Sequence, residues 1–377
     1  MNGLSCPSCG WRPTAAHGAE PHRCPSCASA LSFAVEGRAF PREAIAARPA
    51  QMWRYREALP HFATPVSLGE GVTPLVPLPM DWDGPRALAK CESSLPSGSY
   101  KDRGAATLVS WLHERGVAEA VEDSSGNAGA ALAAYAARAG IRLKVFCPET
   151  ASPGKLAQIE ACGAQLVRVP GPRPRATEAL LEYLAANPET AYASHLWHPL
   201  FLEGVRTMAW EIAEQLEWTL PDWVLCPVGA GSILLGLWRG FEDLRAAGAA
   251  AGAVPRLVAV QAARRSAVVA AFQSGAETVT PAPPDEPTIA EGIAVPAPVR
   301  DREVLAALRA TDGAALRVTE AQIADGWRRL ARAGFYVEPT AAVVWPALLD
   351  LHARQPLPRQ ATVVLILSGH GLKAGAI

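Results

Sequence analysis

Short apolar runs alternate with amphipathic stretches along most of this chain, and many of them are separated by Gly-rich turns. Strands that alternate with helices are typical of an α/β architecture with parallel sheets, because each helix carries the chain back to the edge where the next strand begins. A Pro-rich stretch, residues 279–300, interrupts the pattern and is expected to be a long loop. The expected helices are 106–115, 128–138, 155–162 and 233–241, and the expected strands are 143–147, 166–169, 223–228, 257–261 and 363–367.

Residues 1–35 hold four of the eight cysteines, arranged as two CxxC pairs, Cys6 with Cys9 and Cys24 with Cys27. Two such turns can place four thiolates around one tetrahedral Zn²⁺, and a segment this short cannot bury a core of its own. A site closed by four protein ligands has no open position for catalysis. We expect a structural zinc ribbon here, with a degraded ribbon or a redox pair as the alternative.

The chain has only five lysines. Chemistry that needs a neutral side-chain amine can occur only at these residues, because arginine keeps its charge. They stand at positions 90, 101, 144, 155 and 373. Lys101 follows a Ser-Gly turn at the point where a helix is expected to begin, near Asp102. A helix dipole and the neighbouring Arg103 favour the neutral amine, which suits a nucleophile or base. On this turn alone, an ordinary surface lysine is the alternative.

Three further turns combine small residues with polar groups. Residues 123–129 (DSSGNAG) precede an expected helix, so their N–H groups can bind a carboxylate, and Asn127 adds a neutral amide. Residues 226–233 (CPVGAGSI) suit a single phosphate, since the spacing fits neither a Rossmann fingerprint nor a P-loop. Residues 367–373 (LSGHGLK) place the Ser368 hydroxyl at the end of a strand, where open α/β sheets bind ligands. A plain turn is the alternative for each.

Composition narrows the classes of function. A formal net charge of −1 gives no reason to expect a nucleic-acid partner or an anionic membrane surface. No apolar run approaches the roughly 20 residues that span a bilayer, and the first residues lack the apolar core of a signal peptide. We therefore expect a soluble, cytoplasmic protein whose partner is a small molecule.

Taken together and in this order, these segments resemble the fold-type II pyridoxal-5′-phosphate (PLP) enzymes, and specifically the threonine synthase family in its zinc-ribbon form. The resemblance covers nearly the whole chain, and so many matches in consistent order are highly specific. The matching segments are 53–56 (WRYR), 67–75 (SLGEGVTPL), 99–104 (SYKDRG), 124–141 (SSGNAGAALAAYAARAGI), 148–156 (PETASPGKL), 202–204 (LEG), 229–231 (GAG) and 368–373 (SGHGLK).

The resemblance implies a fold like that of the tryptophan synthase β chain, with two α/β domains and parallel-rich sheets. It also implies a homodimer. The implied domains are a zinc ribbon over 1–35, a large PLP-binding domain over 36–103 and 200–377, and a small mobile domain over 104–199.

Residue by residue, the resemblance also implies the roles of the site. Lys101 would hold PLP as a Schiff base and later move protons, while Asn127 would hydrogen-bond the phenolic oxygen of PLP. Ser368 would face the pyridine nitrogen. The phosphate would be held by Gly229, Ala230, Gly231 and Ser232, and the substrate carboxylate by Ser124, Ser125 and Gly126.

The chain departs from the family pattern where the leaving phosphate of the substrate should bind. His195 and Phe201 stand where the family typically has an asparagine and an arginine, so they are the expected substrate contacts here. An alignment slip, or replacement of the arginine by Arg206 or a histidine, is the alternative. Residues 288–295 look more like the corresponding loop of threonine and serine ammonia-lyases. Residues 122–123 add two carboxylates directly before the carboxylate-binding turn.

Two activities of a carbon–oxygen lyase follow. The first is that of threonine synthase, which eliminates phosphate from O-phosphohomoserine, moves protons through Lys101 and adds water at the β-carbon. The second is β-elimination or β-replacement on an unphosphorylated amino acid, as in a threonine or serine ammonia-lyase. A non-enzymatic PLP-binding or zinc-ribbon interaction protein is a weaker third hypothesis, because every element of the lysine site is present.

Overall fold

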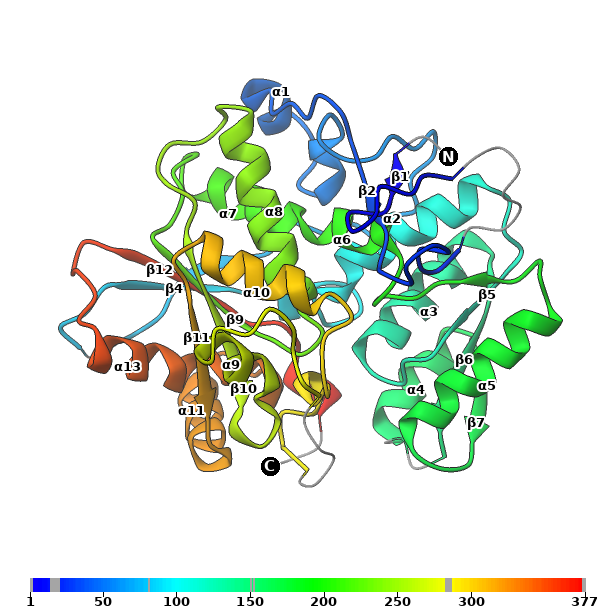
Figure 1. Cartoon of the computed structure of the whole chain (residues 1–377). Helices are drawn as coiled ribbons and strands as arrows, with labels where there is room; N and C mark the ends of the chain where they lie inside the picture. Colours follow the sequence, from blue (N-terminus) through cyan, green and yellow to red (C-terminus); the bar gives the residue numbers. More distant parts are fainter. Residues whose placement is uncertain are drawn as a thin grey trace. The chain divides into compact units, whose positions relative to one another are not determined.

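The computed structural model of this chain describes residues 3–13, 21–80, 82–149, 151, 153–281 and 287–374. The expected zinc ribbon and the Pro-rich loop each include residues outside these ranges. Packing divides the chain into two compact units (Figure 1). The four-stranded unit consists of residues 1–71 and 101–205, and the six-stranded unit of residues 72–100 and 206–377.

The four-stranded unit is built on a wholly parallel sheet in the order β7-β6-β5-β8. A separate antiparallel pair, β1 with β2, lies near its N-terminus. The elements of this unit are β1 (Leu4–Ser5), β2 (Ser32–Phe33), α1 (Arg42–Ala46), η1 (Met52–Tyr55), α2 (Lys101–Glu114), β5 (Glu119–Glu122), α3 (Asn127–Ala139), β6 (Arg142–Pro148), α4 (Pro153–Ala161), β7 (Gln165–Val169), α5 (Arg173–Ala186), β8 (Ala191–Tyr192) and α6 (Pro199–Val205).

Helix α3 shows how the sequence builds this unit. Its repeated alanines favour a helix, and five of the eight alanine side chains are buried. Gly140 ends it in a left-handed conformation, with φ of 71°, which glycine adopts without a steric penalty. The chain then enters β6, whose Phe146 packs with Val121 of β5 and Leu180 of α5. β5, α3 and β6 therefore form a strand–helix–strand arrangement, in which the small side chains of α3 allow close packing.

The six-stranded unit has the sheet order β11-β10-β9-β12-β4-β3, in which only the β3–β4 pair is antiparallel. Its elements are β3 (Leu75–Pro77), β4 (Arg86–Lys90), η2 (Glu92–Ser94), α7 (Thr207–Gln215), β9 (Trp223–Pro227), α8 (Ser232–Ala246), β10 (Arg256–Ala262), η3 (Ala263–Arg265), α9 (Ala267–Gln273), η4 (Glu291–Ile293), α10 (Asp301–Ala310), β11 (Ala314–Val318), α11 (Glu320–Arg332), α12 (Pro339–Ala342), α13 (Val344–Arg354), β12 (Thr362–Ile366) and η5 (Gly371–Lys373).

Both faces of this larger sheet are buried. Trp223 and Leu225 of β9 point into a core cluster with side chains of α11, α12 and α13. Val224 and Cys226, which alternate with them, are fully buried as well, and α8, α9 and α10 contact the same group of strands. A parallel sheet covered on both sides needs continuous apolar strands, which explains the uninterrupted runs in the sequence.

The parallel α/β architecture expected from the alternating pattern is confirmed. Individual boundaries differ, since α2 begins at Lys101 instead of residue 106, and the Pro-rich stretch contains the short helix η4.

The grouping of residues 36–71 differs from the expected domain division. We expected this segment with residues 200–377, whereas it packs in the four-stranded unit. The physical reason is a set of buried polar contacts. Glu70 accepts hydrogen bonds from the Trp53 indole at 2.6 Å and from the Tyr135 hydroxyl at 2.9 Å, and Tyr135 belongs to α3 of the four-stranded unit.

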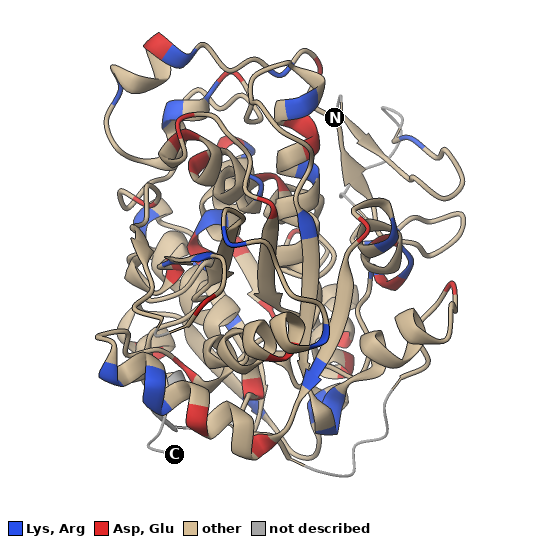
Figure 2. Cartoon of the chain, turned by 90° about the vertical axis from the view of Figure 1, so that its left-hand side faces the viewer, with Lys and Arg blue, Asp and Glu red and all other residues tan. Residues whose placement is uncertain are grey.

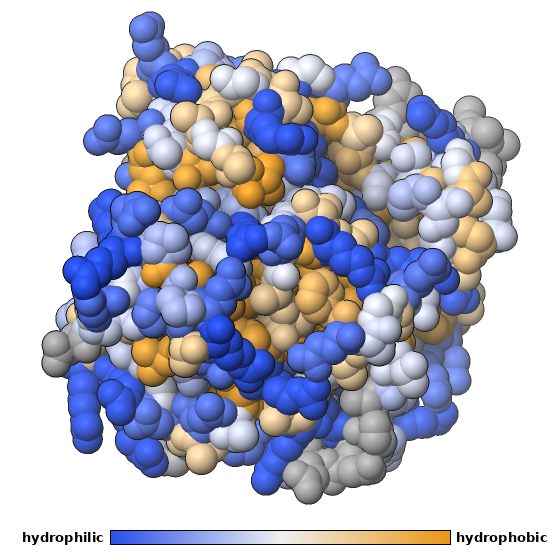
Figure 3. Space-filling model, turned by 60° about the vertical axis from the view of Figure 1, so that its left-hand side comes forward, coloured by the Kyte–Doolittle hydropathy of each residue, from blue (hydrophilic) through white to orange (hydrophobic). Residues whose placement is uncertain are grey.

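Charges of both signs are interspersed along the ribbon in the view of Figure 2, in keeping with the small net charge. On the face shown in Figure 3, hydrophilic residues cover much of the surface, with hydrophobic residues in smaller groups between them. Among the described residues, no helix is both long and apolar enough to cross a membrane.

Candidate active site

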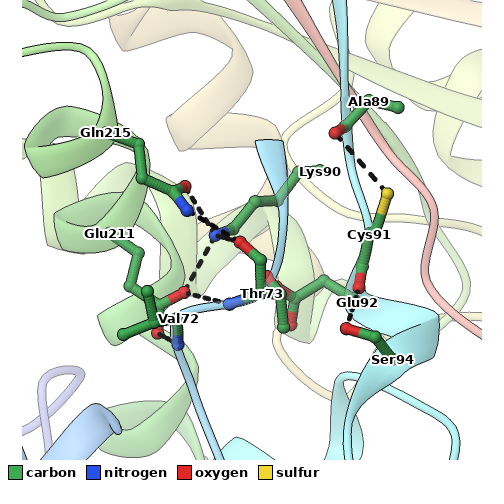
Figure 4. Close-up of polar contacts among 9 residues, drawn as sticks. All are labelled: Val72, Thr73, Ala89, Lys90, Cys91, Glu92, Ser94, Glu211 and Gln215. Carbon is green, nitrogen blue, oxygen red and sulfur yellow. Dashed lines mark hydrogen bonds and ion pairs between the residues drawn. The ribbon is translucent and has the colours of Figure 1, made fainter. Parts of the chain in front are cut away.

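The structure distinguishes the lysines by their surroundings. Lys90 ends β4 and is fully buried. Its Nζ donates to the Thr73 carbonyl oxygen at 2.9 Å, to Glu211 Oε2 at 2.8 Å and to Gln215 Oε1 at 2.9 Å (Figure 4). An ammonium group has three donors, and here all three are used. Lys90 therefore serves the packing of the six-stranded unit and offers no amine for chemistry.

Two more lysines are engaged by neighbouring oxygens. Lys144 Nζ lies 2.7 Å from Glu119 Oε1, and this hydrogen bond raises the pKa of Lys144. Lys373 Nζ donates to the Ser97 carbonyl oxygen at 2.6 Å. The side chain of Lys155 lies outside the described part of the chain. Lys90, Lys144 and Lys373 thus each donate to oxygens of the chain.

Lys101 is the first residue of α2 and is partly buried. Its Nζ lies 5.6 Å from the centroid of the Phe201 ring. Phe201 is fully buried and packs on α2 at Gly104, where an added Cβ would lie 2.5 Å from the ring. The lack of a side chain at Gly104 thus allows an aromatic ring to lie beside the lysine.

The turn between β5 and α3 holds the residues expected to bind a carboxylate. No side chain of the N-cap residue, Gly126, caps the N-terminus of α3, and a helix N-terminus is a favourable place for a carboxylate. A Cβ added to Gly126 would meet only Ser124 Oγ, at 3.9 Å, whereas one added to Gly129 would lie 1.9 Å from the Ser124 carbonyl oxygen. The two glycines therefore differ in purpose: Gly129 permits the tight turn, and Gly126 leaves space beside it.

The second expected cradle, Gly229 to Ser232, lies at the N-terminus of α8, which also has no side-chain cap. Gly231 has φ of 84°, and a Cβ there would lie 2.4 Å from Val304. The Ser232 hydroxyl lies 2.9 Å from the hydroxyl of Tyr100. A helix start without a side-chain cap, with two hydroxyls beside it, suits one phosphate.

Ser368 lies two residues beyond the end of β12 and is 4% exposed. Its carbonyl oxygen accepts a hydrogen bond from the Tyr100 amide at 3.1 Å, and Ser99 pairs with Gly369 in an antiparallel bridge. The Ser99 hydroxyl is buried and makes no hydrogen bond within the described residues. Sequence reasoning missed Ser99 and Tyr100 as site residues, although both belong to the SYKDRG segment it singled out.

A buried acid–base pair lies directly beside the turn expected to bind a carboxylate. His195 Nδ1 is 2.6 Å from Glu122 Oε1, and the two residues are 8% and 0% exposed. Burial, assisted by the negative charge of Asp123, raises the pKa of Glu122 well above its usual value. Burial also holds the pKa of His195 well below its usual value, and the positive charges of Lys101 and Arg173 add to this.

Sequence reasoning placed His195 at the substrate but noted Glu122 only as one of two carboxylates before the turn. The only signal in the sequence was that both positions depart from the family pattern, and the 73 positions between them gave no reason to join them. Asp123 has separate partners, since Thr177 Oγ1 donates to it at 2.6 Å and the Tyr192 hydroxyl at 3.0 Å.

Arg206, the arginine that could replace the family's phosphate ligand, is held elsewhere. Its Nη1 lies 3.0 and 2.9 Å from the two carboxylate oxygens of Asp243, and the residue is 9% exposed. The charge of Arg206 is therefore balanced within the six-stranded unit. Phe201 itself offers no donor to a phosphate.

The four N-terminal cysteines lie together, with all four Sγ atoms within 4.8 Å of one another. The Sγ atoms are 3.5 Å apart in the pairs Cys6–Cys27 and Cys9–Cys24. Four sulfurs at a Zn–S distance of ~2.3 Å in a tetrahedron lie roughly 3.8 Å apart, so the cluster has the size of a zinc site.

The residues in each unit suit the expected cofactor. The six-stranded unit contains the expected phosphate cradle at the start of α8, where a Cβ added to Gly229 or Gly231 would lie within 3 Å of a neighbouring atom. The four-stranded unit supplies a partly buried lysine beside an aromatic ring, and a separate helix N-terminus for a carboxylate. An amine, a phosphate site and a carboxylate site form the donor set that a phosphorylated aldehyde and an amino acid require.

Comparison with known proteins gives a consistent picture. Residues 66–369 match the family model described as pyridoxal-phosphate dependent enzyme. The chain is 35% identical over 338 residues to the threonine synthase of Methanocaldococcus jannaschii, covering 88% of this chain and 82% of that protein. It is 34% identical to the threonine synthase of Methanosarcina acetivorans, covering 85% and 80%.

Among solved structures, a threonine deaminase from T.th. superposes with a TM-score of 0.67 at 27% identity. The superposition covers 79% of this chain and 92% of that one.

Proposed function

Because the chain is a pyridoxal-phosphate-dependent lyase that belongs to the threonine synthase family, we propose that Lys101 is the residue that binds the cofactor. The observation that carries this proposal is the position of Lys101 within the four-stranded unit. Its charge acts on Glu122 and His195, which border the turn where the substrate carboxylate is expected. When bound, pyridoxal phosphate withdraws electrons from the α-carbon of the amino acid.

The other predicted residues would bind and orient. The N–H groups and hydroxyls at Ser124, Ser125 and Gly126 would hold the substrate carboxylate at the start of α3. Asn127 would donate to the phenolic oxygen of the cofactor, and Ser368 would face its ring nitrogen as a neutral partner. The cofactor phosphate would be held at the start of α8 by Gly229, Ala230, Gly231 and Ser232, which is supported by the uncapped helix.

The first candidate substrate is O-phosphohomoserine, which would be converted to threonine. The support is that two relatives at 34–35% identity are threonine synthases. Lys101 would take the α-proton and return protons as phosphate leaves and water adds at the β-carbon.

The second candidate substrate is an unphosphorylated amino acid that undergoes β-elimination or β-replacement. Three observations favour it. Phe201 offers no charge, Arg206 is bound to Asp243, and His195 is bound to Glu122. A phosphate dianion needs donors of the kind that a bidentate arginine supplies, and each charged hydrogen bond contributes about 1.5–3 kcal/mol.

One assay separates the two candidates. The purified protein is incubated with O-phosphohomoserine and, separately, with L-threonine or L-serine. Release of inorganic phosphate supports the first candidate, and release of ammonia with a keto acid supports the second. A protein that carries the cofactor but acts on neither substrate contradicts both.

The cofactor lysine has its own test. Lys101→Ala should abolish the visible absorbance of the lysine-bound cofactor in the purified protein, whereas Lys144→Ala should retain it. Loss of the absorbance in Lys144→Ala but not in Lys101→Ala would contradict the proposal.

We also propose a structural Zn²⁺ at Cys6, Cys9, Cys24 and Cys27, supported by the size of the sulfur cluster. Metal analysis should find about one zinc per chain. Cys9→Ser combined with Cys27→Ser should lose the metal while the visible absorbance of the cofactor remains.

The homodimer and the cytoplasmic location stay predictions. Sedimentation equilibrium of the full chain would measure the first, since a homodimer has twice the mass of 39.7 kDa. Cell fractionation of the producing organism would measure the second.

A further inference from the structure

Glu122 and His195 form a pair that is almost completely buried, with the two residues 0% and 8% exposed. Glu122 ends β5, and His195 follows β8, the strand that pairs with β5. Glu122 Oε1 contacts His195 Nδ1 at 2.6 Å, while Glu122 Oε2 is buried with no hydrogen bond among the described residues. An ionised carboxylate so buried would leave one oxygen without a donor, which is costly, so the neutral acid fits this position better.

Burial is the largest effect that favours the protonated form of Glu122, and the nearby charges act on it in both directions. The negative charge of Asp123 favours the protonated acid, whereas the positive charges of Arg173 and Lys101 favour the carboxylate; burial and Asp123 prevail. The same two cations oppose a charge on His195. With Glu122 protonated and His195 neutral, the Glu122 O–H donates to Nδ1, and the remaining ring proton is on Nε2.

The Nε2–H group is the part of the pair that can reach a ligand. No hydrogen bond to Nε2 occurs within the described residues, and His195 retains 8% exposure. The His195 ring lies 6.0 Å from the Phe201 ring, whose centroid is 5.6 Å from Lys101 Nζ. One aromatic ring therefore contacts both the lysine and the histidine.

We propose that His195, supplied by Glu122, is the acid that protonates a hydroxyl as it leaves the substrate side chain. The C–O bond breaks, its electron pair goes to oxygen, and the Nε2 proton joins that oxygen to form water. The Glu122 proton moves to Nδ1, so His195 stays neutral and Glu122 becomes a carboxylate. One proton from solvent then restores the pair.

The proposal names a substrate class, and it rests on the proposed function, because it needs Lys101 to act at the α-carbon. Hydroxide is a poor leaving group and requires a proton, whereas phosphate and chloride leave without one. A site that offers a neutral acid, and no cationic ligands for a phosphate, therefore favours amino acids whose leaving group is a hydroxyl over those whose leaving group is a phosphate. His195 is the catalytic residue of the pair, and Glu122 is a positioning residue that also stores the proton.

The test compares two leaving groups, using L-serine and β-chloro-L-alanine as probes with the cofactor-loaded full chain. Wild-type protein should eliminate both. Glu122→Gln and His195→Gln should each lower kcat with L-serine by about 100-fold or more, the usual contribution of general acid catalysis. Their rates with β-chloro-L-alanine should stay within about threefold of wild type, because chloride needs no acid.

A matched control is Asp123→Asn, which changes the neighbouring carboxylate but leaves the contact between Glu122 and His195. It should not separate the two probes. Equal losses on both probes in Glu122→Gln would mean that the pair only supports the fold, and unchanged rates with L-serine would mean that it plays no part; either result overturns the proposal.

Failure of the proposal and failure of the proposed function give different results. Wild-type protein that eliminates β-chloro-L-alanine but not L-serine overturns the role of the pair and leaves the lyase intact. Wild-type protein that eliminates neither probe and releases no phosphate from O-phosphohomoserine overturns the proposed function as well.

A second measurement does not depend on activity. The infrared spectrum of the full chain at neutral pH should contain the C=O band of a protonated carboxylic acid, which Glu122→Gln removes and Asp123→Asn retains. If the wild-type protein and Glu122→Gln show the same carboxylic acid bands, Glu122 is ionised and the proposed proton store is overturned.

Discussion

Lys90 and Glu122 are both ionisable and both fully buried, yet the structure surrounds them differently. Every donor of Lys90 meets an oxygen, and its main partner, Glu211, also accepts from the Val72 and Thr73 amides at 2.8 and 3.2 Å. Glu122 has His195 on one oxygen and no hydrogen bond on the other within the described residues. A buried group whose hydrogen bonds are all made is held in one protonation state. A buried group that lacks a hydrogen-bond partner can gain or lose a proton more readily.

The Lys90–Glu211 pair should have the largest effect on stability when one partner is removed. Glu211→Ala leaves an ammonium buried without its anion, so we expect a loss of about 3–5 kcal/mol in the free energy of unfolding, measured by urea denaturation. The double variant Lys90→Met with Glu211→Leu should lose less, because it removes both charges. If Glu211→Ala costs no more than a surface substitution, Lys90 is not the structural lysine described above.

The Glu122–His195 pair should make the free energy of unfolding depend on pH. Burial raises the folded-state pKa of Glu122 above its unfolded value of about 4.5, so the folded protein keeps a proton that the unfolded chain releases. This contribution to stability is full below the unfolded pKa and is lost as pH rises toward the folded pKa. Relative to Glu122→Gln, wild-type protein should lose ~1.4 kcal/mol per pH unit in that window.

The measurement is urea unfolding of both proteins at several pH values above the unfolded pKa of Glu122. A difference between them that does not change with pH contradicts a protonated Glu122 and removes the contrast with Lys90.

The Glu119–Lys144 pair is the partly exposed case, with side chains 19% and 20% exposed. The hydrogen bond from Lys144 lowers the pKa of Glu119 to about 2, so its contribution is present above the unfolded pKa and is lost as pH falls. Glu119→Gln should cost about 0.2–1 kcal/mol near neutral pH, since water screens the pair. Thermal unfolding at neutral and acidic pH should show a pH dependence of opposite sign to that of Glu122.

Much of the site could be predicted from the sequence because its parts are local. The turns at residues 124–127 and 229–232 contain the glycines that the backbone requires, and both precede a helix as expected. The parallel architecture followed from continuous apolar runs such as β12. The cysteine cluster followed from the CxxC spacing, and its four sulfurs do lie together.

Other features were out of reach because they join distant parts of the chain. The partners of the Arg206–Asp243 and Lys90–Glu211 pairs are 37 and 121 positions apart, and no local motif predicts that they meet. The placement of residues 36–71 with the four-stranded unit depends likewise on Glu70 reaching Tyr135, 65 positions away. Such contacts depend on which strands become neighbours.

The sequence by itself determined the parallel α/β class, the family and the glycine turns, because short-range sterics and spacing decide these, and it predicted Lys101 as the cofactor lysine. Only the tertiary structure decided which lysine is inert, which arginine is already paired, and that Glu122 and His195, 73 positions apart, form one buried pair. The physical reason is the sheet order: β5 and β8 are neighbours, so the residues at and just beyond their ends meet away from water, where a proton is shared instead of released.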